Sequence, residues 1–456
     1  MKICAYVQES YAKSAYKNEC MDRRQFAGLH VIIDSLKRAG INVDYAGISN
    51  VNKYDIILVS LTSDCDWWSF IKERMQWQKG EYKVLIGGAG VLHVAPFLQW
   101  FDVAIFGRGE NLIVPLVSEI ERGNRFHDDS IMWSDEFDIN RVWRIAQVDK
   151  PYSNIVKLSN GKVFAEGAIG CNHHCLFCGY TWHRKFASPY KHYKMEDSLF
   201  GNIADKERAM LDLNDDSYSV DFSKLRTTAI DGFSERLRIG VGKPITRDII
   251  ERFLTAMVNS GQKPHKLKLY NICGFPTETE NDWHEFINTV KEVDARFNSD
   301  EKQWMMDLHS TPFRAMPATP MACAPMQKRN FRNVFAKTIA NSQNGLILYR
   351  GKRISVVDSF AIDSLATVML SAIAHRGSVE DSENIAKLCC TKKFWSASSL
   401  VKENTLSKYF DMDKLFDAFT PEQLPSKYLR TYLPIERSWG KTPLEKEFLK
   451  MARHRK

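Results

Sequence analysis

Short apolar runs alternate with amphipathic stretches along the first 125 residues of the chain. Four runs are rich in Ile, Val, Leu and aromatic side chains and have the length of buried strands: Lys2–Val7, Tyr54–Thr62, Lys83–Ile86 and Asp102–Phe106. Between them, Asp22–Ala39 and Trp67–Gln78 place apolar residues at helical spacing. Strands that alternate with helices form parallel sheets with helices on both faces. The pattern therefore predicts an α/β chain that begins with a doubly wound, Rossmann-like domain over residues 1–125.

Glycines follow two of these strands. Gly87, Gly88 and Gly90 come after the third strand, and Gly107 and Gly109 come after the fourth. Ligands of doubly wound sheets bind at the carboxyl ends of the strands, where a glycine lets the backbone approach closely. Neither turn carries the G-x-G-x-x-G spacing of a dinucleotide site. Ligand binding and ordinary turn formation are therefore both left open for these glycines.

The periodicity changes after residue 125. Residues 126–154 show no clear period and are interpreted as a linker. The segment Ile155–Ile169 predicts a hairpin that turns at Asn160. A second α/β domain is expected over 155–325, and the pattern over 326–456 predicts a mostly helical C-terminal region.

Composition excludes several classes of protein. With 26% charged and 44% hydrophobic residues, the chain is neither disordered nor collagen-like. The stretch that comes nearest to a membrane span, Ile354–Ala374, carries Asp358 and Asp363, so it is interpreted as a buried helix and no membrane is expected. Met1–Ser10 lacks the features of a signal peptide, and most of the ten cysteines are scattered, which favours a reducing, cytoplasmic setting. The net charge of +8 permits an anionic partner, and the oligomeric state stays open.

Cys171, Cys175 and Cys178 lie within eight residues, in a C-x3-C-x2-C spacing. Three thiolates on one short loop can converge on one metal centre, and thiolate is a soft ligand that suits iron–sulfur clusters and zinc. A Cys3His zinc site that uses His173 or His174 is chemically sound, although structural zinc sites commonly take ligands from two knuckles and no second knuckle follows. Buried thiols without a metal are the remaining alternative.

This cysteine spacing, with Phe177 directly before the third cysteine, resembles that of the radical S-adenosylmethionine (SAM) enzymes. The resemblance implies a partial (β/α) barrel over 155–325, in which the three cysteines hold a [4Fe–4S] cluster and leave one iron open for SAM. It also implies that Phe177 and Gly179 lie against the bound cofactors. An external electron donor of the flavodoxin or ferredoxin type would then drive cleavage of SAM to a 5′-deoxyadenosyl radical, which abstracts hydrogen from the substrate.

Three later segments resemble further marks of the family, in the family's order: Ala209–Ser217, Ala229–Thr246 and Leu267–Glu280. The first segment resembles the strand where polar side chains approach the SAM amino group, and this role falls on Asn214 and Asp215. The third segment resembles a strand that brings Tyr270 to the SAM end, followed by a Gly-Phe-Pro turn that leads into a helix.

The middle segment is similar to one in the cobalamin-associated branch of the family. The resemblance assigns Asp231 to the ribose hydroxyls and assigns Ser234 and Arg236 to the SAM carboxylate. These residue types suit the roles, since a carboxylate accepts hydrogen bonds from vicinal hydroxyls and a guanidinium offers a fork to a carboxylate. A helix cap or a surface ion pair is the alternative for each of the three.

Within this superfamily, a doubly wound domain placed before the cysteines resembles the cobalamin-binding module, and Leu85–Glu110 is similar to its later strands. The Asp-x-His-x-x-Gly motif that supplies a histidine to cobalt is absent, and His30 and His93 lack its context. Bound cobalamin would imply methyl transfer to an unactivated carbon. Without cobalamin, hydrogen abstraction would lead to rearrangement, oxidation or bond cleavage. A cobalamin-associated methyltransferase is the expected function, and the second outcome stays open.

Basic and aromatic residues interleave after the cysteines, with no acidic residue between Cys178 and Lys194, and the tail Lys441–Lys456 is also basic. Such a surface can stack bases and neutralise phosphates, so a nucleotide or nucleic-acid substrate is one hypothesis. A small-molecule substrate at an active-site wall, or simple aromatic packing, is the other. The same residues suit a third class of protein, a zinc-stabilised module that binds nucleic acid.

Cys323 lies in a Pro-rich turn after the expected last strands of the barrel. A thiol at this point could return a hydrogen atom to a substrate radical, which makes Cys323 a candidate catalytic residue. A small buried side chain that packs in the turn is the alternative.

Overall fold

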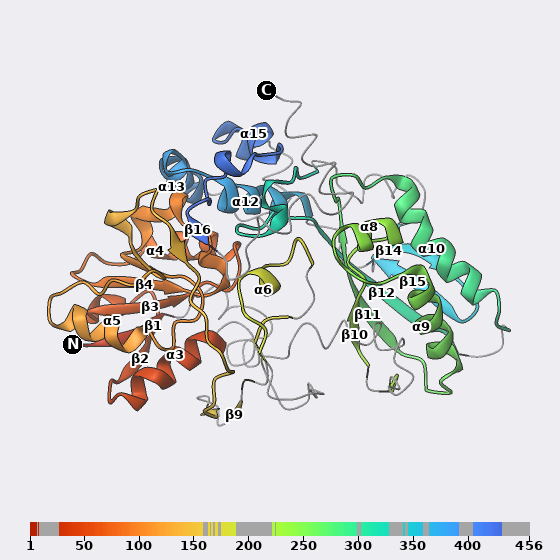
Figure 1. The fold of residues 1–456 in the computed structure, drawn as a ribbon, viewed down its shortest axis with the longest axis horizontal. Helices are drawn as coiled ribbons and strands as arrows, with labels where there is room; N and C mark the ends of the chain where they lie inside the picture. The colour runs from red at the N-terminus through yellow and green to blue at the C-terminus, as the bar shows by residue number, and fades with distance from the viewer. Residues whose placement is uncertain are drawn as a thin grey trace.

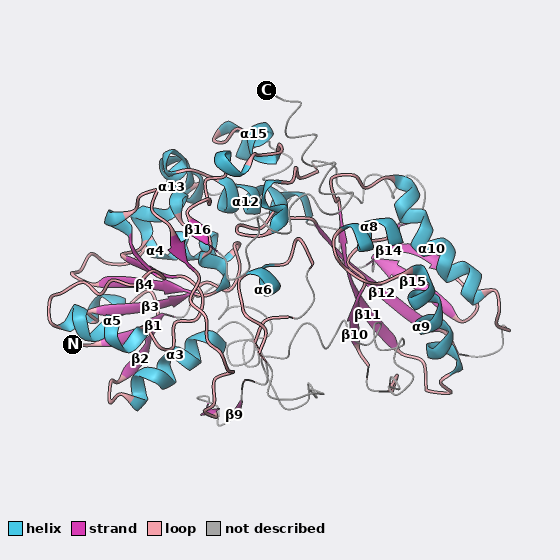
Figure 2. Cartoon of the chain, in the orientation of Figure 1, coloured by secondary structure: helices cyan, strands magenta, loops and turns pink. Residues whose placement is uncertain are grey.

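The computed structural model describes residues 1–6, 8, 27–157, 163–164, 166, 169–171, 175–187, 221–223, 225–298, 302–327, 341–342, 345–358, 364–391 and 405–430. Two six-stranded sheets organise these residues. The sheets lie at opposite ends of the molecule, and the short helix α6 (Gly179–Trp182) lies between them (Figure 1). The helices of the C-terminal part of the chain form a third group, which lies above the first sheet in this view (Figure 2).

The first sheet has the strand order of a doubly wound fold. Its strands are β1 (Ile3–Tyr6), β2 (Val43–Ala46), β3 (Ile56–Ser60), β4 (Lys83–Gly87), β5 (Val103–Ile105) and β6 (Ile131–Trp133). They are arranged in the order β2-β1-β3-β4-β5-β6, and all neighbours are parallel except β5 and β6. The order reverses between β1 and β3, which is the switch point where ligands bind in such sheets. The predicted parallel α/β arrangement is confirmed for this part of the chain.

Both faces of the first sheet are buried. The connecting elements are α3 (Ala27–Arg38), η1 (Val51–Lys53), α4 (Asp66–Arg74), η2 (Ala89–Val91), η3 (Ala95–Trp100), α5 (Ile113–Glu121) and η4 (Ser134–Glu136). On β3, Ile56 and Leu58 enter the core under α3 and α5, while Ile57 and Val59 enter the core that contains Trp67. This alternation explains why the strands read as continuous apolar runs.

Two strands of the first sheet were not predicted. In β2 the central residues Asp44 and Tyr45 are exposed, because this strand lies at the edge of the sheet. An edge strand that buries only its ends gives a weak apolar pattern. The other strand, β6, spans three residues inside the predicted linker 126–154 and closes the opposite edge by antiparallel pairing with β5.

The second sheet continues beyond the predicted end of the central domain. Its strands are β10 (Thr227–Ala229), β11 (Lys266–Cys273), β12 (Trp304–Pro312), β13 (Asn341–Ser342), β14 (Gly345–Arg350) and β15 (Ile354–Asp358). The order is β10-β11-β12-β15-β14-β13, with the first four strands parallel and the last two pairings antiparallel. The described strands confirm a parallel α/β arrangement, and closure into a partial barrel stays a prediction.

Helices cover one face of the second sheet. They are α8 (Glu235–Gly240), α9 (Arg247–Asn259) and α10 (Glu280–Asp294). The Thr246 hydroxyl caps α9 by accepting from the Ile249 amide at 3.3 Å, and Thr279 opens α10 with a reciprocal capping box. Alternate side chains of β11 and β12, such as Leu269 and Leu308, are buried against these helices. The opposite face of the sheet is polar and partly exposed.

The prediction of a single helix over Ile354–Ala374 is wrong in its first part. Ile354–Asp358 forms β15, and α12 (Ser364–Arg376) begins only at Ser364. The β-branched residues of this segment pair with β12 on one side and β14 on the other, so tertiary pairing decides the structure. The description of 326–456 as mostly helical is therefore incorrect for β13, β14 and β15.

The remaining elements lie near the first sheet or beside the cysteine loop. They are β7 (Trp143–Arg144), β8 (Val156–Lys157), β9 (Val163–Phe164), η7 (Pro320–Cys323), η8 (Val379–Asp381), α13 (Ser382–Cys390), η9 (Leu406–Lys408), α15 (Met412–Phe416), η10 (Pro421–Gln423) and β16 (Leu429–Arg430). β8 and β9 pair antiparallel, as expected for the predicted hairpin, and its turn at Asn160 lies outside the described residues.

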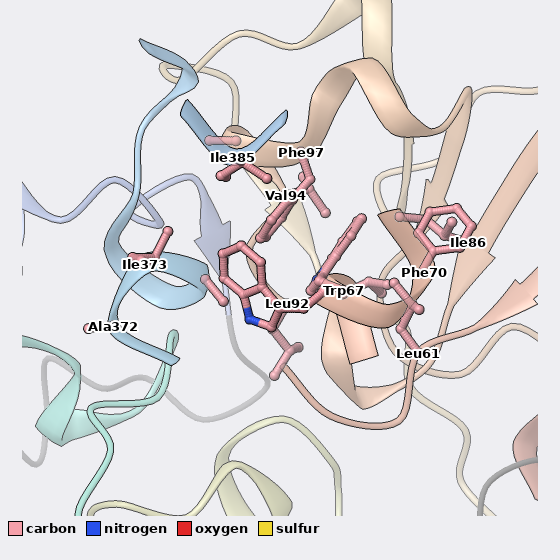
Figure 3. Packing of buried hydrophobic residues seen from close by; sticks show 14 of the residues in the cluster. Leu61, Trp67, Phe70, Ile86, Leu92, Val94, Phe97, Ala372, Ile373 and Ile385 are labelled. Atoms are coloured by element: carbon pink, nitrogen blue, oxygen red, sulfur yellow. The ribbon is translucent and has the colours of Figure 1, made fainter. Parts of the chain in front are cut away.

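The C-terminal helices share a core with the first sheet. Figure 3 shows Ile373 of α12 and Ile385 of α13 on the same cluster as Trp67 and Phe97. The Trp67 and Phe97 rings are stacked with centroids 4.1 Å apart. No helix in the described part of the chain is long and apolar enough to cross a membrane.

Candidate functional site

The cysteine loop is closed at its base by main-chain contacts. Ile169 and Ala187 exchange two backbone hydrogen bonds, of 2.8 and 3.0 Å. Gly170, directly before Cys171, has a φ of 66°, and a Cβ there would lie 3.0 Å from the Arg184 carbonyl oxygen. Only glycine adopts this left-handed conformation without strain, so Gly170 allows the chain to turn into the loop.

The middle of the loop is fixed between two other segments. The Leu176 amide donates to the Val241 carbonyl at 2.9 Å, and the Leu176 carbonyl accepts from the Met321 amide at 3.2 Å. The Cys175 thiol lies 3.9 Å from the Gly242 carbonyl oxygen, to which it donates. The loop is thus held between the turn that follows α8 and the segment that follows β12.

Phe177 and Gly179 have clear structural environments. The half-buried Phe177 ring lies 5.8 Å from the Phe275 ring, which belongs to the Gly-Phe-Pro turn after β11. At Gly179, a Cβ would lie 2.5 Å from Cε1 of His183. His183 is buried, with Nε2 2.9 Å from the Pro317 carbonyl oxygen, and burial lowers its pKa to about 4. Gly179 therefore makes room for a neutral, fixed imidazole.

The three cysteines carry thiolate sulfur, which is the donor that iron–sulfur clusters require. Cys171 and Cys175 are buried, and Cys178 is half-buried. Within the described ranges, however, no group of three or more His, Cys, Asp and Glu side chains is arranged to hold a metal ion. His173 and His174, the alternative zinc ligands, lie outside the described residues. Metal binding at this loop is thus a matter for proposal.

Asp231 occupies a constrained turn after β10. Its φ is 48°, in the left-handed region, and its Oδ2 lies 2.7 Å from Nζ of Lys243, which is fully buried. The next residue, Gly232, donates its amide to Asn271 Oδ1 at 2.9 Å, and Asn271 in turn donates to the Ser310 hydroxyl. Non-glycine residues in this region are held there by their surroundings and are frequent at functional sites.

Ser234 and Arg236 both contact Asp282 at the start of α10. The Ser234 hydroxyl donates to Asp282 Oδ1 at 2.6 Å and caps α8, and an Arg236 guanidinium nitrogen lies 2.8 Å from Asp282 Oδ2. Although burial alone would raise the pKa of Asp282, the bonds from Arg236 and Ser234 lower it overall. These contacts are the cap and ion pair that the sequence left open as alternatives.

The other predicted SAM contacts are less fully described. Tyr270 is 38% exposed on the polar face of the second sheet, where its ring centroid lies 5.8 Å from that of His309. Asn214 and Asp215 lie outside the described residues.

Cys323 is buried at the end of η7. Burial raises the pKa of its thiol to about 12, even though the Arg376 guanidinium acts in the opposite direction. Arg376 itself is buried and donates to the carbonyl groups of Ala322, Ala324, Leu415 and Asp417. This surrounding matches a packed thiol, the alternative that the sequence left open, and hydrogen donation by Cys323 stays a prediction.

The basic aromatic segment is only partly on the surface. Trp182 is buried and donates its indole N–H to the Cys175 carbonyl at 2.9 Å, so it cannot stack on a base. Lys185 pairs with Asp149 at 2.6 Å, and the Arg184 guanidinium lies 4.2 Å from the centroid of the Tyr180 ring. The segment beyond residue 187 and the basic tail lie outside the described residues.

The glycines at the ends of β4 and β5 are needed for contacts within the chain. A Cβ at Gly88, whose φ is 104°, would lie 2.4 Å from the Leu61 carbonyl oxygen. A Cβ at Gly107, whose φ is 86°, would lie 2.5 Å from the Ala146 carbonyl oxygen. Close approach of two backbones explains both residues, in line with ordinary turn formation.

The two histidines of the first domain are packing residues. His93 is buried, with Nδ1 3.0 Å from the Tyr428 hydroxyl and Nε2 2.7 Å from the Gly377 carbonyl oxygen. Burial lowers the pKa of His93 to about 4. His30 is also buried, and its Nδ1 lies 3.4 Å from the Tyr45 hydroxyl. His93, with both ring nitrogens engaged, is not offered to a metal.

Sequence reasoning missed two features near the carboxyl edge of the first sheet. Gln8 follows β1 and is 1% exposed, yet neither polar atom of its amide has a hydrogen-bond partner in the described structure. Asp64 follows β3 and lies 3.1 Å from Arg314 and 3.4 Å from His375. No local motif indicates either feature. For Asp64 the reason is that its partners lie more than 200 residues away in the sequence.

Comparisons with known proteins add weak similarities. No family model matches the chain. It is 25% identical to the uncharacterized protein MJ0966 of Methanocaldococcus jannaschii, across 58% of this chain and 70% of that protein. Two solved structures of the cobalamin-dependent SAM radical enzyme OxsB are also similar. One, with aqua-cobalamin bound, has a TM-score of 0.23 and 10% identity over 69% of this chain. The other, with aqua-cobalamin and SAM bound, has a TM-score of 0.19 and 11% identity over 67% of this chain.

The chain spans less than half the length of these solved structures, 44% of one and 38% of the other. At such TM-scores the similarity does not establish a shared fold.

Proposed function

We propose that this protein is a radical SAM enzyme, in which Cys171, Cys175 and Cys178 hold a [4Fe–4S] cluster that binds SAM. The observation that carries the proposal is the C-x3-C-x2-C loop itself, which places three cysteines on a segment fixed by main-chain hydrogen bonds. With the cluster and SAM bound, the site would support reductive cleavage of the SAM sulfonium. A flavodoxin- or ferredoxin-type donor would supply the electron.

The residues around the cysteine loop support this proposal because they hold the Asp231 carboxylate in a fixed orientation. The turn that contacts Cys175 through Gly242 continues directly into Lys243, whose ammonium orients the Asp231 carboxylate. Asp231 is thereby held by the residue that follows the Cys175 contact, and its carboxylate can accept hydrogen bonds from the ribose hydroxyls of SAM. Ser234 and Arg236 stabilise the start of α10, so a contact between them and the SAM carboxylate requires exchange with Asp282.

We further propose that the first domain binds cobalamin and that the reaction is a methyl transfer. The parallel sheet has its switch point between β1 and β3, and Gln8 offers a buried amide without a partner among the described residues at that edge. His93 is engaged within the protein, so cobalt would receive no ligand from it. Radical modification of a nucleotide without cobalamin is the alternative function.

An anaerobic preparation tests both parts of the proposal. We expect iron and acid-labile sulfide in a ratio near that of one [4Fe–4S] cluster, together with bound cobalamin and production of 5′-deoxyadenosine from SAM. Stoichiometric zinc without sulfide would contradict the enzyme function and favour a zinc-stabilised protein. Cluster without cobalamin would leave radical SAM chemistry and remove the methyl-transfer proposal.

Replacement of Cys171, Cys175 and Cys178 by Ala provides the first specific prediction. Three lost thiolates leave no ligands for the cluster at this loop, so 5′-deoxyadenosine production should fall to background while the fold persists. Cys390→Ala is the matched control, because Cys390 is exposed on α13. Residual SAM cleavage by the triple variant, or equal loss in the control, would count against the assignment.

A further inference from the structure

The face of the second sheet opposite α9 and α10 presents polar side chains on the described residues of β11 and β12. Along β11, Leu267 and Leu269 are buried in the core beneath α9 and α10, while Lys268 and Tyr270 alternate with them on the opposite face. In a sheet with both faces buried, these alternate positions would be apolar as well. Their polarity indicates that this face meets solvent or a polar ligand.

The parallel register brings the polar residues of two strands together. Lys268 on β11 pairs with Asp307 on β12, and Tyr270 pairs with His309. Paired residues of adjacent strands point to the same face. The Tyr270 and His309 ring centroids are 5.8 Å apart in an edge-to-face arrangement, and the Lys268 ammonium lies 5.7 Å from the centroid of the Tyr270 ring.

Asp307 organises this group. Its side chain is 2% exposed, and its Oδ2 lies 2.6 Å from Nζ of Lys266 and 3.3 Å from Nε2 of His309. The carboxylate therefore balances the charge of Lys266 and fixes one nitrogen of the imidazole. The imidazole is itself only 14% exposed, so its orientation is set by the sheet rather than by solvent.

Among Lys266, Lys268 and Asp307 there is one more positive charge than negative. Lys266 and Asp307 form the ion pair, whereas the contact recorded for Lys268 within the described ranges is with an aromatic ring. Burial lowers the pKa of His309, and the nearby charge of Lys268 lowers it further. An anion bound beside these two groups would oppose the effect of Lys268 and raise that pKa.

We propose that this face is the binding site for an anionic group of the substrate, a carboxylate or a phosphate. Lys268 supplies the charge, His309 donates a directed hydrogen bond from Nδ1 once the bound anion favours its protonated form, and Tyr270 forms a flat wall beside both. That the anionic group belongs to the substrate rests on the proposed radical SAM function. The anion site itself does not, because it uses none of the cysteines.

Anion titrations followed by NMR of the full chain test the site. With histidine labelled at Cε1, inorganic phosphate and, separately, acetate are added at constant ionic strength, and the His309 signal is assigned with His309→Asn. We expect the anion to shift this signal and to raise the pKa of His309. Lys268→Gln should weaken binding about tenfold, as loss of one close charge implies, and Lys268→Arg should retain it. Lys291→Gln is the control, since Lys291 contacts the Tyr349 ring in a separate pair.

The two anions distinguish the sources of the charge. Tighter binding of phosphate supports a phosphorylated substrate, and equal or tighter binding of acetate supports a carboxylate. The proposal is overturned if neither anion shifts the His309 signal, or if Lys268→Gln and the unmodified protein bind equally well. A protein that binds phosphate in this way but makes no 5′-deoxyadenosine would retain the site and refute the proposed function.

Discussion

The Glu278 carboxyl group shows how strongly the surroundings of one residue act on its charge. It is buried in the turn between β11 and α10, where it accepts from the Phe275 amide at 2.9 Å and from the Trp283 indole. Burial raises its pKa to about 7, and these two donors only partly oppose that change. Glu278 therefore takes up a proton at a higher pH than an exposed glutamate does.

The raised pKa of Glu278 predicts a pH-dependent stability. A carboxyl group whose pKa is higher in the folded state stabilises the fold below its unfolded pKa, and this stabilisation is lost as the pH rises through about 7. The free energy of unfolding should fall by roughly 3 kcal/mol between pH 4.5 and pH 8 from this group. Denaturation at a series of pH values measures the change.

Glu278→Gln serves as the comparison, since an amide does not titrate in this range. The variant should show a flatter profile by the same amount. Parallel profiles for the two proteins would show that Glu278 does not change its protonation on unfolding.

At the scale of single residues, the sequence indicated which residues carry useful chemistry better than it indicated which residues they contact. The cysteine spacing and Phe177 were evident, because they are local. The partner of Ser234 and Arg236 was not, because Asp282 lies 46 to 48 residues further along the chain. Lys243 was missed for a related reason, since a lysine in a Gly-Lys-Pro turn looks exposed until the fold buries it beside Asp231.

The junction of α8 with α10 illustrates the scale of elements. Asp282 receives bonds from Ser234 and Arg236, and it completes the capping box of α10 with Thr279. One carboxylate therefore fixes the start of one helix and the position of another.

We predict that Asp282→Asn lowers the free energy of unfolding by about 2 kcal/mol. The amide keeps the shape of the side chain, but the Ser234 hydroxyl and the Arg236 guanidinium lose the charged acceptor to which they donate. Asp248→Asn is the matched control, because Asp248 is 75% exposed and pairs with Arg252 one turn away, where the expected cost is about 0.5 kcal/mol or less. Urea denaturation of both variants checks the difference, and equal costs would show that the junction adds no stability.

Elements were predictable where both faces are buried or where a helix has one apolar side. The strands β3 and β5 and the helix α3 lie within the segments that the pattern predicts, and β4 and α4 extend one residue beyond theirs. The failures are β2, an edge strand with polar central residues, and β15, whose sequence belongs to a mostly apolar stretch that also contains α12. Pairing partners decide both, and a sequence pattern does not contain them.

Across the whole molecule, the two sheets are connected by a polar contact at a buried carboxylate. Asp64 follows β3 of the first sheet, Arg314 follows β12 of the second, and His375 belongs to α12. Burial alone would raise the pKa of Asp64, but the charge of Arg314 lowers it overall. Arg314 also reaches the Ser371 hydroxyl at 3.3 Å, so three parts of the chain meet at one carboxylate.

Removal of Arg314 should therefore destabilise the contact between the sheets. Arg314→Gln leaves the Asp64 carboxylate buried with less compensation, and we expect a loss of about 2–4 kcal/mol in the free energy of unfolding. Adding Asp64→Asn should recover part of this loss, because the uncompensated charge is then gone. Arg144→Gln is the control, since that side chain is 74% exposed and 3.7 Å from Asp129. No recovery in the double variant would argue against a coupled pair.

The contacts of Tyr428 have a consequence for how the chain folds as it is made. Its ring lies 5.7 Å from that of Trp143, and its hydroxyl meets His93, which is separated from it by 335 positions. On the ribosome, residue 93 emerges long before residue 428. The apolar surface that Tyr428 covers therefore stays exposed until residue 428 has been synthesised. A protein with this arrangement should depend on chaperones during translation more than its ordinary α/β topology suggests.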